Sequence, residues 1–358
     1  MGIADKALEN LNKNLHVVNH SCLNFRHKNS RCDICMSQCP AGAINITSYR
    51  KKITVDWEKC LGCFGCTSVC PTEVFWPKTG EIKTFIENAF ARSKNYKYLC
   101  ISCSIGKKTL NNDWVLHIPS MRMISWIYLL MLTFKSVERI DFVKGDCDTC
   151  SIQECSKHLN AEIEKLKHIL EIMDKDIPLI NILKDEEYSE PEYFKYECRK
   201  DSILVSRREM FGLFKKRVKE SIGSSFTMLG HNDKQELRIA ENYRLPKKRQ
   251  LLLDLFERIN NKRSDLLEKT VDLTALDFAE VAIDGNKCVK CEVCTKICPT
   301  GALTANCSDD ESKYIAFTPA YCINCGLCEM VCTNNSISRS KPVNLQSIAA
   351  KCTTILQT

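Results

Sequence analysis

Residues 60–71 read Cys-Leu-Gly-Cys-Phe-Gly-Cys-Thr-Ser-Val-Cys-Pro, a run in which cysteines recur after two, two and three intervening residues and a proline follows the last. The run is repeated over residues 288–299 and, without the closing proline, over 322–332. A fourth copy, over residues 22–40, has nine residues between its first two cysteines. The four runs hold sixteen of the 24 cysteines in this 358-residue chain, so their spacing is the strongest signal in the sequence.

This spacing predicts iron–sulfur clusters. In two-cluster modules, the first three thiolates of a run bind one cluster and the fourth binds the other cluster. Sixteen thiols therefore supply four ligands to each of four [4Fe–4S] clusters, and electron transfer is the first function that the sequence suggests. The chain contains no phosphate-binding loop, dinucleotide-binding motif or nucleophile elbow. We expect a non-catalytic electron-transfer subunit, with any further chemistry taking place in a partner.

The interval of three residues before the fourth cysteine predicts a helical turn. Cys66 and Cys70 stand at i and i+4, so both side chains are expected on one face of that turn. Pro71 is expected to end it, because proline disfavours helix at the residue before it. Residues 40–44 and 299–303 each predict a turn that leads into a short strand.

Zinc and disulfides are the alternative uses of such cysteines. Pairs of cysteines two residues apart also build zinc sites, but three successive cysteines followed by a fourth exceed what a tetrahedral zinc needs. The N-terminal residues 1–9 have acidic side chains and no apolar core, which predicts no export signal and hence a reducing, cytoplasmic location. The longest apolar stretch, residues 123–134, is too short to cross a membrane and predicts a buried helix.

Each pair of runs resembles a bacterial-type two-cluster ferredoxin domain, over residues 20–78 and 284–340. The resemblance implies four sets of ligands, which we call quartets. Quartet A is Cys22, Cys32, Cys35 and Cys70; quartet B is Cys60, Cys63, Cys66 and Cys39; quartet C is Cys288, Cys291, Cys294 and Cys332; quartet D is Cys322, Cys325, Cys328 and Cys298. Two departures stand out. The long interval after Cys22 requires a loop through residues 26–28, and Thr333 replaces the usual proline.

The region between the two pairs, residues 95–185, has an α/β pattern. Short apolar strands are predicted over 96–101, 115–118, 139–143 and 177–183, with helices over about 121–136 and 153–174. Strands that alternate with helices predict a parallel sheet. The remaining cysteines fall near the carboxyl ends of these strands, where sites in such sheets collect. They are Cys100, Cys103, Cys147, Cys150 and Cys155.

This central region resembles the delta iron–sulfur subunit of methyl-viologen-reducing hydrogenase and heterodisulfide reductase complexes. The likeness rests on residues 100–104 at the end of a strand, 120–122 at the start of a helix, and 145–147 after the third strand. It implies one further cluster, [2Fe–2S] or [4Fe–4S], held by Cys100 or Cys103 together with Cys147, Cys150 and Cys155. In the alternative, Cys100 packs as a small hydrophobe and the domain serves as a dock. Pro119 departs from the family, which has a cysteine there. Cys198, Cys307 and Cys352 are isolated and are interpreted as incidental.

A basic segment precedes the second pair of runs. Residues 195–269 carry nineteen Lys and Arg against eleven Asp and Glu, whereas the whole chain has a net charge of +7. A helical stripe of Leu251, Leu252, Leu255, Phe256 and Ile259 follows Pro246. The segment predicts a helical linker that packs this stripe on the modules, or a docking surface for an acidic ferredoxin or flavodoxin. Nucleic-acid binding is not expected, because no reader motif is present.

The predicted fold class is α+β ferredoxin-like domains at both ends, with a central α/β parallel-sheet domain and a basic helical linker. The expected boundaries are 1–94, 95–188, 189–279 and 280–358. The predicted function is a polyferredoxin that relays electrons between a low-potential donor and an oxidoreductase partner. Two alternatives remain open: an electron-input subunit of a hydrogenase-like or heterodisulfide-reductase-like complex, and a redox-sensing assembly factor.

Overall fold

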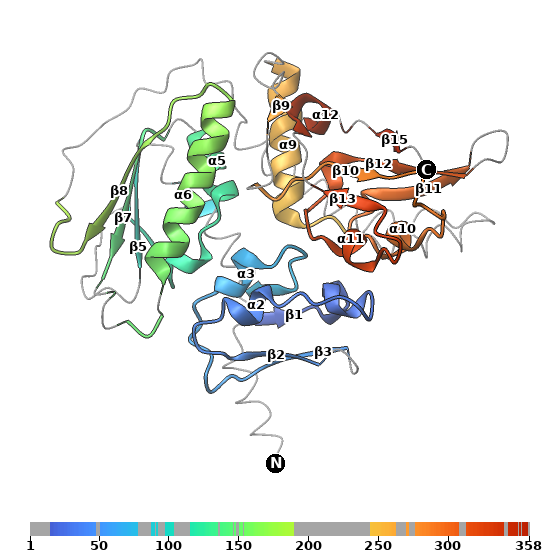
Figure 1. Ribbon diagram of the computed structural model, residues 1–358. Helices are drawn as coiled ribbons and strands as arrows, with labels where there is room; N and C mark the ends of the chain where they lie inside the picture. The colour runs from blue at the N-terminus through green and yellow to red at the C-terminus, as the bar shows by residue number, and fades with distance from the viewer. Residues whose placement is uncertain are drawn as a thin grey trace, which may run out of the picture.

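The structure is a computed structural model, and three bodies meet in it around one helix (Figure 1). The described residues are 15–47, 51–77, 87–89, 91, 97–103, 115–134, 137–145, 147, 150–152, 154–189, 244–262, 270–271, 276–307, 313–339, 343–349, 351 and 353–356. Two stretches of the basic segment, Ser-Arg-Arg-Glu-Met-Phe over 206–211 and Lys-Lys-Arg-Val-Lys over 215–219, lie outside these residues, as do Cys198 and Cys352.

The central body contains the predicted parallel sheet. Its strands are β5 (Tyr98–Cys103), β6 (Val115–Ile118), β7 (Arg139–Lys144) and β8 (Leu179–Lys184), in the order β6-β5-β7-β8. All three neighbouring pairs are parallel. The connections run through the 3-10 turn η4 (Met121–Met123), helix α5 (Trp126–Thr133) and helix α6 (Cys155–Ile172). The four predicted strands and the helix predicted over 153–174 are therefore present within two residues of their expected ends. The helix predicted over 121–136 is instead divided into η4 and the shorter α5, with extended backbone at Ile124 and Ser125 between them.

Helix α5 is buried along its whole length, as the apolar stretch over 123–134 predicts. It packs against α6 and against α9 (Lys247–Lys262). A helix that is apolar all round needs partners on every side, and these two helices and the sheet supply them. Among the described residues, no helix combines the length and apolar character needed to cross a membrane.

The first ferredoxin-like body is built from two short antiparallel ribbons. Strand β1 (Leu15–Val17) pairs with β4 (Phe75–Pro77), and β2 (Ile44–Thr47) pairs with β3 (Lys52–Val55). Two short helices, α2 (Ile34–Ser37) and α3 (Gly65–Val69), each precede the last cysteine of a run. The turn at residues 40–43 leads directly into β2, as the sequence predicts.

The second body repeats this plan. Strand β10 (Val281–Ile283) pairs with β13 (Ile337–Arg339), and β11 (Leu303–Cys307) pairs with β12 (Lys313–Phe317), which also pairs with β15 (Thr354–Leu356). Helices α10 (Val293–Ile297) and α11 (Leu327–Val331) precede Cys298 and Cys332. The remaining elements are η7 (Pro319–Tyr321), α12 (Leu345–Ala349) and the pair β9 (Thr270–Val271) and β14 (Val343–Asn344).

Helix α9 joins the three bodies. Leu252, Phe256 and Ile259 of the predicted stripe are almost fully buried, and the helix contacts α5 on one side and α12 on the other (Figure 1). This part of the basic segment is therefore a packed structural helix. Before it, the backbone N–H of Arg244 donates to the carbonyl of Pro299 in the second body.

The first body caps the N-terminus of α9. The buried carboxylate of Glu73 accepts hydrogen bonds from the backbone N–H groups of Lys247 at 2.7 Å and Lys248 at 2.8 Å. The first N–H groups of a helix have no partner within the helix, and a negative charge there also interacts favourably with the helix dipole. Lys248 of α9 also binds the first body, because its Nζ donates to the carbonyl of Ser68 at 2.7 Å.

We predict that Glu73→Ala lowers the free energy of unfolding by about 1–3 kcal/mol, because it leaves two backbone donors at a buried helix end without a partner. Anaerobic thermal and denaturant unfolding, followed by circular dichroism, measures this loss. Glu58→Ala is the matched control, since Glu58 is exposed on the same body, and its effect should stay within about 0.5 kcal/mol. Equal effects of the two variants would contradict the role of Glu73.

Candidate iron–sulfur centres

The structure gathers the sixteen cysteines of the four runs into four groups, and the members of each group affect one another's ionisation. The groups comprise Cys22, Cys32, Cys35 and Cys70 (A); Cys39, Cys60, Cys63 and Cys66 (B); Cys288, Cys291, Cys294 and Cys332 (C); and Cys298, Cys322, Cys325 and Cys328 (D). Each group draws three cysteines from one stretch of chain and one from the other run of its pair. These are the quartets that the ferredoxin resemblance implies.

Quartet A is the more buried set of the first body. Burial, followed by the neighbouring thiols of Cys70 and Cys32, raises the pKa of Cys22 to about 11. Burial, followed by Cys70, Cys22 and Cys32, raises the pKa of Cys35 to about 12. Thiols so placed stay protonated at neutral pH unless a metal replaces the proton, because the thiolate is the metal ligand.

Quartets A and B adjoin each other. Burial raises the pKa of Cys66 well above its usual value, and the nearby thiols that add to this effect include Cys35 of quartet A as well as Cys60 and Cys63 of its own quartet. The first body thus holds two thiol groups side by side, with a member of each within electrostatic reach of the other.

The second body contains the same arrangement. Burial, followed by Cys291 and Cys288, raises the pKa of Cys294 in quartet C to about 12, with a smaller contribution from Cys332. In quartet D, burial raises the pKa of Cys325 to about 12, and the thiol of Cys298 adds to it. Here too the fourth member of each quartet comes from the neighbouring run.

The fourth cysteine of each run lies just beyond its helix. Helix α3 ends at Val69, and Cys70 has an extended backbone at φ −72° and ψ 117°. Helix α11 likewise ends before Cys332, at φ −73° and ψ 103°. The expectation that Cys66 and Cys70 share one helical face is therefore wrong. Pro71 favours the extended backbone of Cys70, because a residue before proline is pushed out of the helical region. Cys332 has the same backbone although Thr333 follows it, so a proline is not required for it.

This extended backbone brings N–H groups to the fourth sulfur. Each donor is four residues after the cysteine: Ala43 donates to Cys39 at 3.3 Å, Val74 to Cys70 at 3.4 Å, and Ser336 to Cys332 at 3.3 Å. Hydrogen bonds to ligand sulfur stabilise the thiolate and adjust the reduction potential of a cluster. The donors are thus placed where a metal-bound thiolate would use them.

The loops around quartets B, C and D share one backbone conformation. The second and fourth residues after the first cysteine have positive φ angles, as at Gly62 (62°) and Phe64 (56°) for quartet B, and at Asn324 (50°) and Gly326 (72°) for quartet D. Lys290 (54°) and Glu292 (59°) repeat the pattern for quartet C. Left-handed residues can turn successive N–H groups toward one concave side, where anions bind. Four thiols, N–H donors to sulfur and such loops together fit an anionic [4Fe–4S] group.

Asn24 closes the unusual loop of quartet A. Its side-chain oxygen accepts from the N–H of Cys32 at 3.0 Å, and its Nδ2 donates to the carbonyl of the same residue at 2.5 Å. Two 3-10 turns, η1 (Asn19–Ser21) and η2 (Leu23–Phe25), flank Cys22, which is buried. The nine-residue interval therefore folds back on itself and places Cys22 beside Cys32.

Arg122 of the central body inserts into the first body next to quartet B. Its guanidinium donates to the carbonyl of Gln38, and its own carbonyl accepts from the Ser68 hydroxyl at 2.7 Å. A Cβ at Gly65 would lie 3.0 Å from the Arg122 Nε, so the glycine makes room for it. The positive charge of Arg122 opposes the burial that raises the pKa of Cys63.

Two further arginines lie near quartet D. Arg339 donates to the Asn324 side chain at 2.7 Å and to Glu329 at 2.8 Å. Arg249 of α9 is buried over the ring of Phe278, 3.6 Å from its centre. Burial lowers the pKa of Arg249 to about 10, against the opposing charge of Asp277, so the group remains a cation at neutral pH.

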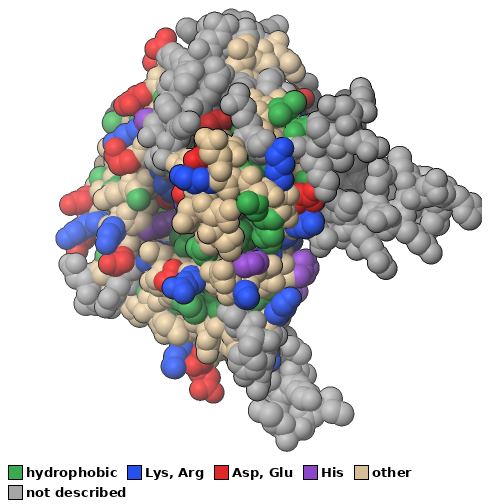
Figure 2. All heavy atoms as spheres, turned by 45° about the vertical axis from the view of Figure 1, so that its right-hand side comes forward, with side chains coloured by type: hydrophobic (Ala, Val, Ile, Leu, Met, Phe, Trp, Pro, Cys, Tyr) green, Lys and Arg blue, Asp and Glu red, His purple; other side chains and the backbone are tan. Residues whose placement is uncertain are grey.

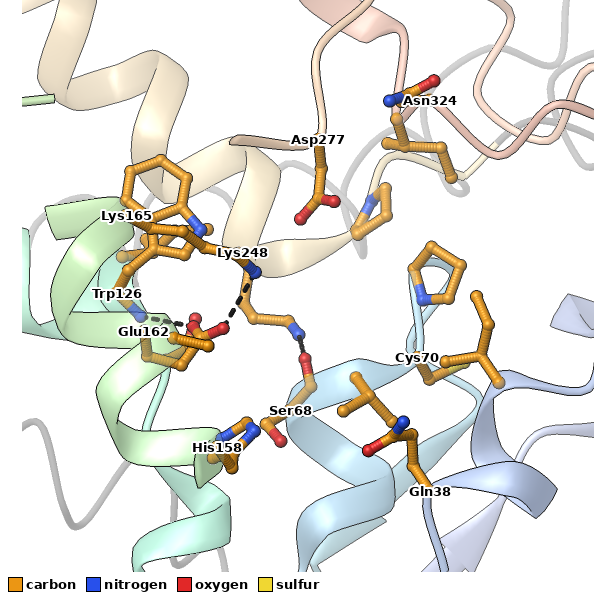
Figure 3. A pocket seen from close by; sticks show the side chains of 18 of the residues that line it. Gln38, Ser68, Cys70, Trp126, His158, Glu162, Lys165, Lys248, Asp277 and Asn324 are labelled. Atoms are coloured by element: carbon orange, nitrogen blue, oxygen red, sulfur yellow. Dashed lines mark hydrogen bonds and ion pairs between the residues drawn. The ribbon is translucent and has the colours of Figure 1, made fainter. Parts of the chain in front are cut away.

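A cavity of about 460 Å³ opens where the three bodies meet. Figure 3 shows side chains from all three bodies that line it. They are Gln38, Ser68 and Cys70 from the first body, Trp126, His158, Glu162 and Lys165 from the central body, Lys248 from α9, and Asp277 and Asn324 from the second body. Its charged groups take part in contacts within the chain. Lys165 pairs with Glu162 at 2.9 Å, and Lys248 binds the end of α3.

The cysteines of the central body lie on two different sides of the sheet. Cys100 faces a small core with Val115 and Tyr188, on one side of β5. Cys103, three residues on, faces the other side, because side chains alternate along a strand. Burial raises the pKa of Cys155, with Cys103 and Cys150 adding to it, so these three thiols lie near one another. Cys147 is exposed.

Several supporting residues carry no signal that sequence reasoning could use. Asn24, Glu73 and Arg339 are ordinary polar residues in the sequence, and their roles depend on partners far away in the chain. Arg122 stands out in the sequence only as part of a helix start. The glycines of the cysteine loops do carry a signal in the sequence. Glycine indicates a position where another group comes close to the backbone, as at Gly65, or where the backbone is left-handed, as at Gly326.

Known proteins resemble the two outer bodies. Residues 30–74 and 287–336 match the family described as 4Fe-4S dicluster domain. An uncharacterized ferredoxin of Methanocaldococcus jannaschii is 38% identical over 58 residues, which are 16% of this chain and 74% of that ferredoxin. No solved structure matches the chain.

Two relatives are components of enzyme complexes. The pyruvate synthase subunit PorD of Methanocaldococcus jannaschii is 37% identical over 57 residues, which are 16% of this chain and 62% of that protein. A component of an ion-translocating oxidoreductase complex of Methanosarcina acetivorans is 45% identical over 40 residues, 11% of this chain and 14% of that protein. The family match leaves out residues 75–286, and the hydrogenase-delta resemblance of the central region therefore stays a prediction.

We predict that Asn24→Leu opens the Cys22 loop and loosens quartet A, because leucine removes both hydrogen bonds to Cys32. Iron content of anaerobically prepared protein should then fall from about sixteen to about twelve per chain. Asn45→Leu, on the ribbon of the same body, is the control and should keep the full content. An unchanged iron content in Asn24→Leu would contradict this role.

We also predict that Gly326→Ala destabilises the protein more than Gly42→Ala. Both glycines have positive φ, so each alanine costs about 1–2 kcal/mol in backbone strain. Nothing lies within 4 Å of a Cβ at Gly42, whereas a Cβ at Gly326 would lie 2.8 Å from Arg339 Nη2. Displacing Arg339 from its partners should cost about 1–3 kcal/mol more. Anaerobic unfolding measures the loss of stability in both variants. Equal losses in the free energy of unfolding would contradict this prediction, because they would show that Arg339 can move aside without a cost in stability.

Proposed function

The chain belongs to the family of 4Fe-4S dicluster ferredoxins, and on this premise we propose that it relays single electrons through four [4Fe–4S] clusters between a low-potential donor and an oxidoreductase partner. Iron–sulfur electron transfer of the ferredoxin type is supported by the family match and by the ferredoxin and oxidoreductase-subunit relatives. The number of clusters, their individual ligands and the partners are our proposal.

One observation carries the proposal: the fold brings four separate groups of four thiols together, each with a member from a second run. When bound to such a quartet, a [4Fe–4S] cluster supplies reversible one-electron oxidation and reduction. The chain's own contribution is to hold each quartet in a buried place, with N–H donors at the sulfurs of Cys39, Cys70 and Cys332.

Positive charges nearby favour the reduced state of a cluster, since reduction adds a negative charge. Arg122 takes this position for quartet B, and Arg249 and Arg339 for quartet D. Because these guanidiniums are partly or wholly withdrawn from water, their effect is screened less than that of a surface lysine. We propose that they set quartets B and D at higher potentials than the same quartets would have without them.

The partner is proposed to be a redox protein: a ferredoxin, a flavodoxin or a subunit of an oxidoreductase. One relative is named as a subunit of an ion-translocating oxidoreductase complex and another as a subunit of pyruvate synthase, which supports a role within an enzyme complex. Figure 2 shows basic and acidic side chains interspersed over the described part of one face. An electron-input subunit of a larger complex and a redox-sensing assembly factor are the two other roles that the family match accommodates. A cytoplasmic location stays a prediction.

A fifth centre in the central body also stays a prediction. Its thiols would be Cys103, Cys150 and Cys155, which lie near one another, with Cys147 on the same loop region. Cys100 is not part of this group, because it packs on the opposite side of β5. The comparisons with known proteins support the clusters of the two outer bodies and give no support for this additional one.

We predict that anaerobically purified protein contains about sixteen irons and an equal amount of acid-labile sulfide per chain, and that electron paramagnetic resonance of the reduced form shows [4Fe–4S] signals. A clear excess of iron would indicate the fifth centre. Stopped-flow reduction by dithionite, followed by mixing with an oxidised ferredoxin, tests the relay. Zinc without sulfide, or clusters that take up electrons but pass none on, would contradict the proposed function.

A further inference from the structure

An apolar contact joins the two ferredoxin-like bodies. Leu23 of the first body packs against Ile297, Leu327 and Val331 of the second, and each of these four side chains is buried. Of the four, Leu23 alone comes from the first body. It lies in η2 and meets the facing helices α10 and α11.

The residues of this contact are neighbours of cluster ligands in the chain. Leu23 follows Cys22 of quartet A, while Ile297 and Leu327 directly precede Cys298 and Cys328 of quartet D. The fourth residue, Val331, precedes Cys332 of quartet C. Two ligands border the contact themselves: Cys32 of quartet A and Cys325 of quartet D pack against it. The two quartets are therefore separated by a thin layer of aliphatic side chains.

The junction cavity provides a second, separate indication. Cys70 of quartet A, labelled in Figure 3, lines it, and so does Cys325 of quartet D. Ile34 and Ile323, from the loops between the cysteines of these two quartets, line it as well. The cavity thus has part of quartet A in one wall and part of quartet D in another.

Among the described residues, no cysteine of quartet B or C packs against this contact or lines the cavity, although Val331 of the contact precedes Cys332 of quartet C in the chain. In the second body, the loop residue Val289 of quartet C is 67% exposed, whereas the matching residue Ile323 of quartet D is 6% exposed. Cys291 of quartet C is itself exposed. In the first body, Leu61 beside Cys60 of quartet B and the matching Ile34 of quartet A are each 40% exposed, but Ile34 lines the cavity and Leu61 does not.

Resting on the proposed function, we infer that the Leu23 contact is the bridge between the two bodies and that it places quartets A and D as inner neighbours. The four metal groups then form one line in the order B, A, D, C. Quartets A and B already adjoin within the first body through Cys35 and Cys66. Quartets B and C are the two outer ends, and redox partners meet the chain at the loops containing Leu61 and Val289.

The test uses spin–spin coupling between reduced clusters, measured by electron paramagnetic resonance on the full chain. A variant with Cys60→Ala, Cys63→Ala, Cys288→Ala and Cys291→Ala removes quartets B and C and should retain about eight irons. We expect its A and D signals to be split by mutual coupling. Two independent signals at eight irons would overturn the inference.

The matched variant removes quartets A and D through Cys32→Ala, Cys35→Ala, Cys322→Ala and Cys325→Ala. Its B and C signals should be uncoupled, with the same iron content. If B and C were coupled instead, the order of the line would be wrong.

A second measurement keeps all sixteen cysteines. Leu23→Asp places a charge in the apolar contact and should abolish the coupling between the bodies, while the coupling within each body remains. Leu179→Asp is the control, since Leu179 is 57% exposed on β8 of the central body, and its spectrum should match that of the unmodified chain. Coupling unaffected by Leu23→Asp would also overturn the inference.

These outcomes are separable from a failure of the proposed function. If the protein lacks iron and sulfide, the function itself is wrong. If four clusters form and electrons pass within each body, while the A and D signals remain independent, the function stands and only the bridge is wrong.

Discussion

The structure depends on bringing four thiols from two separate stretches of chain into each quartet. A single run does not complete a quartet, because its fourth cysteine lies beyond its helix in an extended backbone and joins the neighbouring quartet, as Cys70 and Cys332 do. With the ligands that we propose, each body would be tied together by crossed ligands as well as by its apolar core. In bodies whose ribbons are only three to five residues per strand, such crossed ligands would be a large part of what holds the fold, because small cores bury little apolar surface.

The three bodies are joined by charged and polar groups that also belong to the clusters' surroundings. Glu73 follows the first cysteine module closely in the chain and caps α9, while Lys248 of α9 binds the end of α3. Arg122 of the central body reaches the backbone of Gln38, one residue before Cys39. Because buried polar groups are costly when unpaired, these hydrogen bonds between the bodies favour one arrangement of them. The contacts that assemble the protein therefore also shape the environment of its clusters.

Much of the candidate site could be predicted from the sequence, because ligand spacing is a local property. The pairs of runs and the central strands near 98–103 and 139–144 follow from short patterns, whereas the quartets come from the ferredoxin resemblance. The prediction that Cys66 and Cys70 share a helical face is wrong, because the helix ends before the fourth cysteine. Pro71 favours this end, but Cys332 leaves its helix in the same way before Thr333. Cys100 could have been set apart from Cys103 by the alternation of strand side chains. Asn24 and Arg122 could not be recognised, because their roles depend on contacts that form only on folding.

The sequence by itself determined the chemistry: the number, spacing and type of ligands in each run, and with them the class of cofactor. Only the tertiary structure decided how the runs stand relative to one another, because hydrophobic packing is non-directional and leaves no local pattern. Leu23 is one leucine among many in the chain, yet its burial against Ile297 and Leu327 brings quartet A to quartet D. The ligands are a property of nearest neighbours along the chain, whereas the order of the clusters is a property of surfaces that meet only after folding.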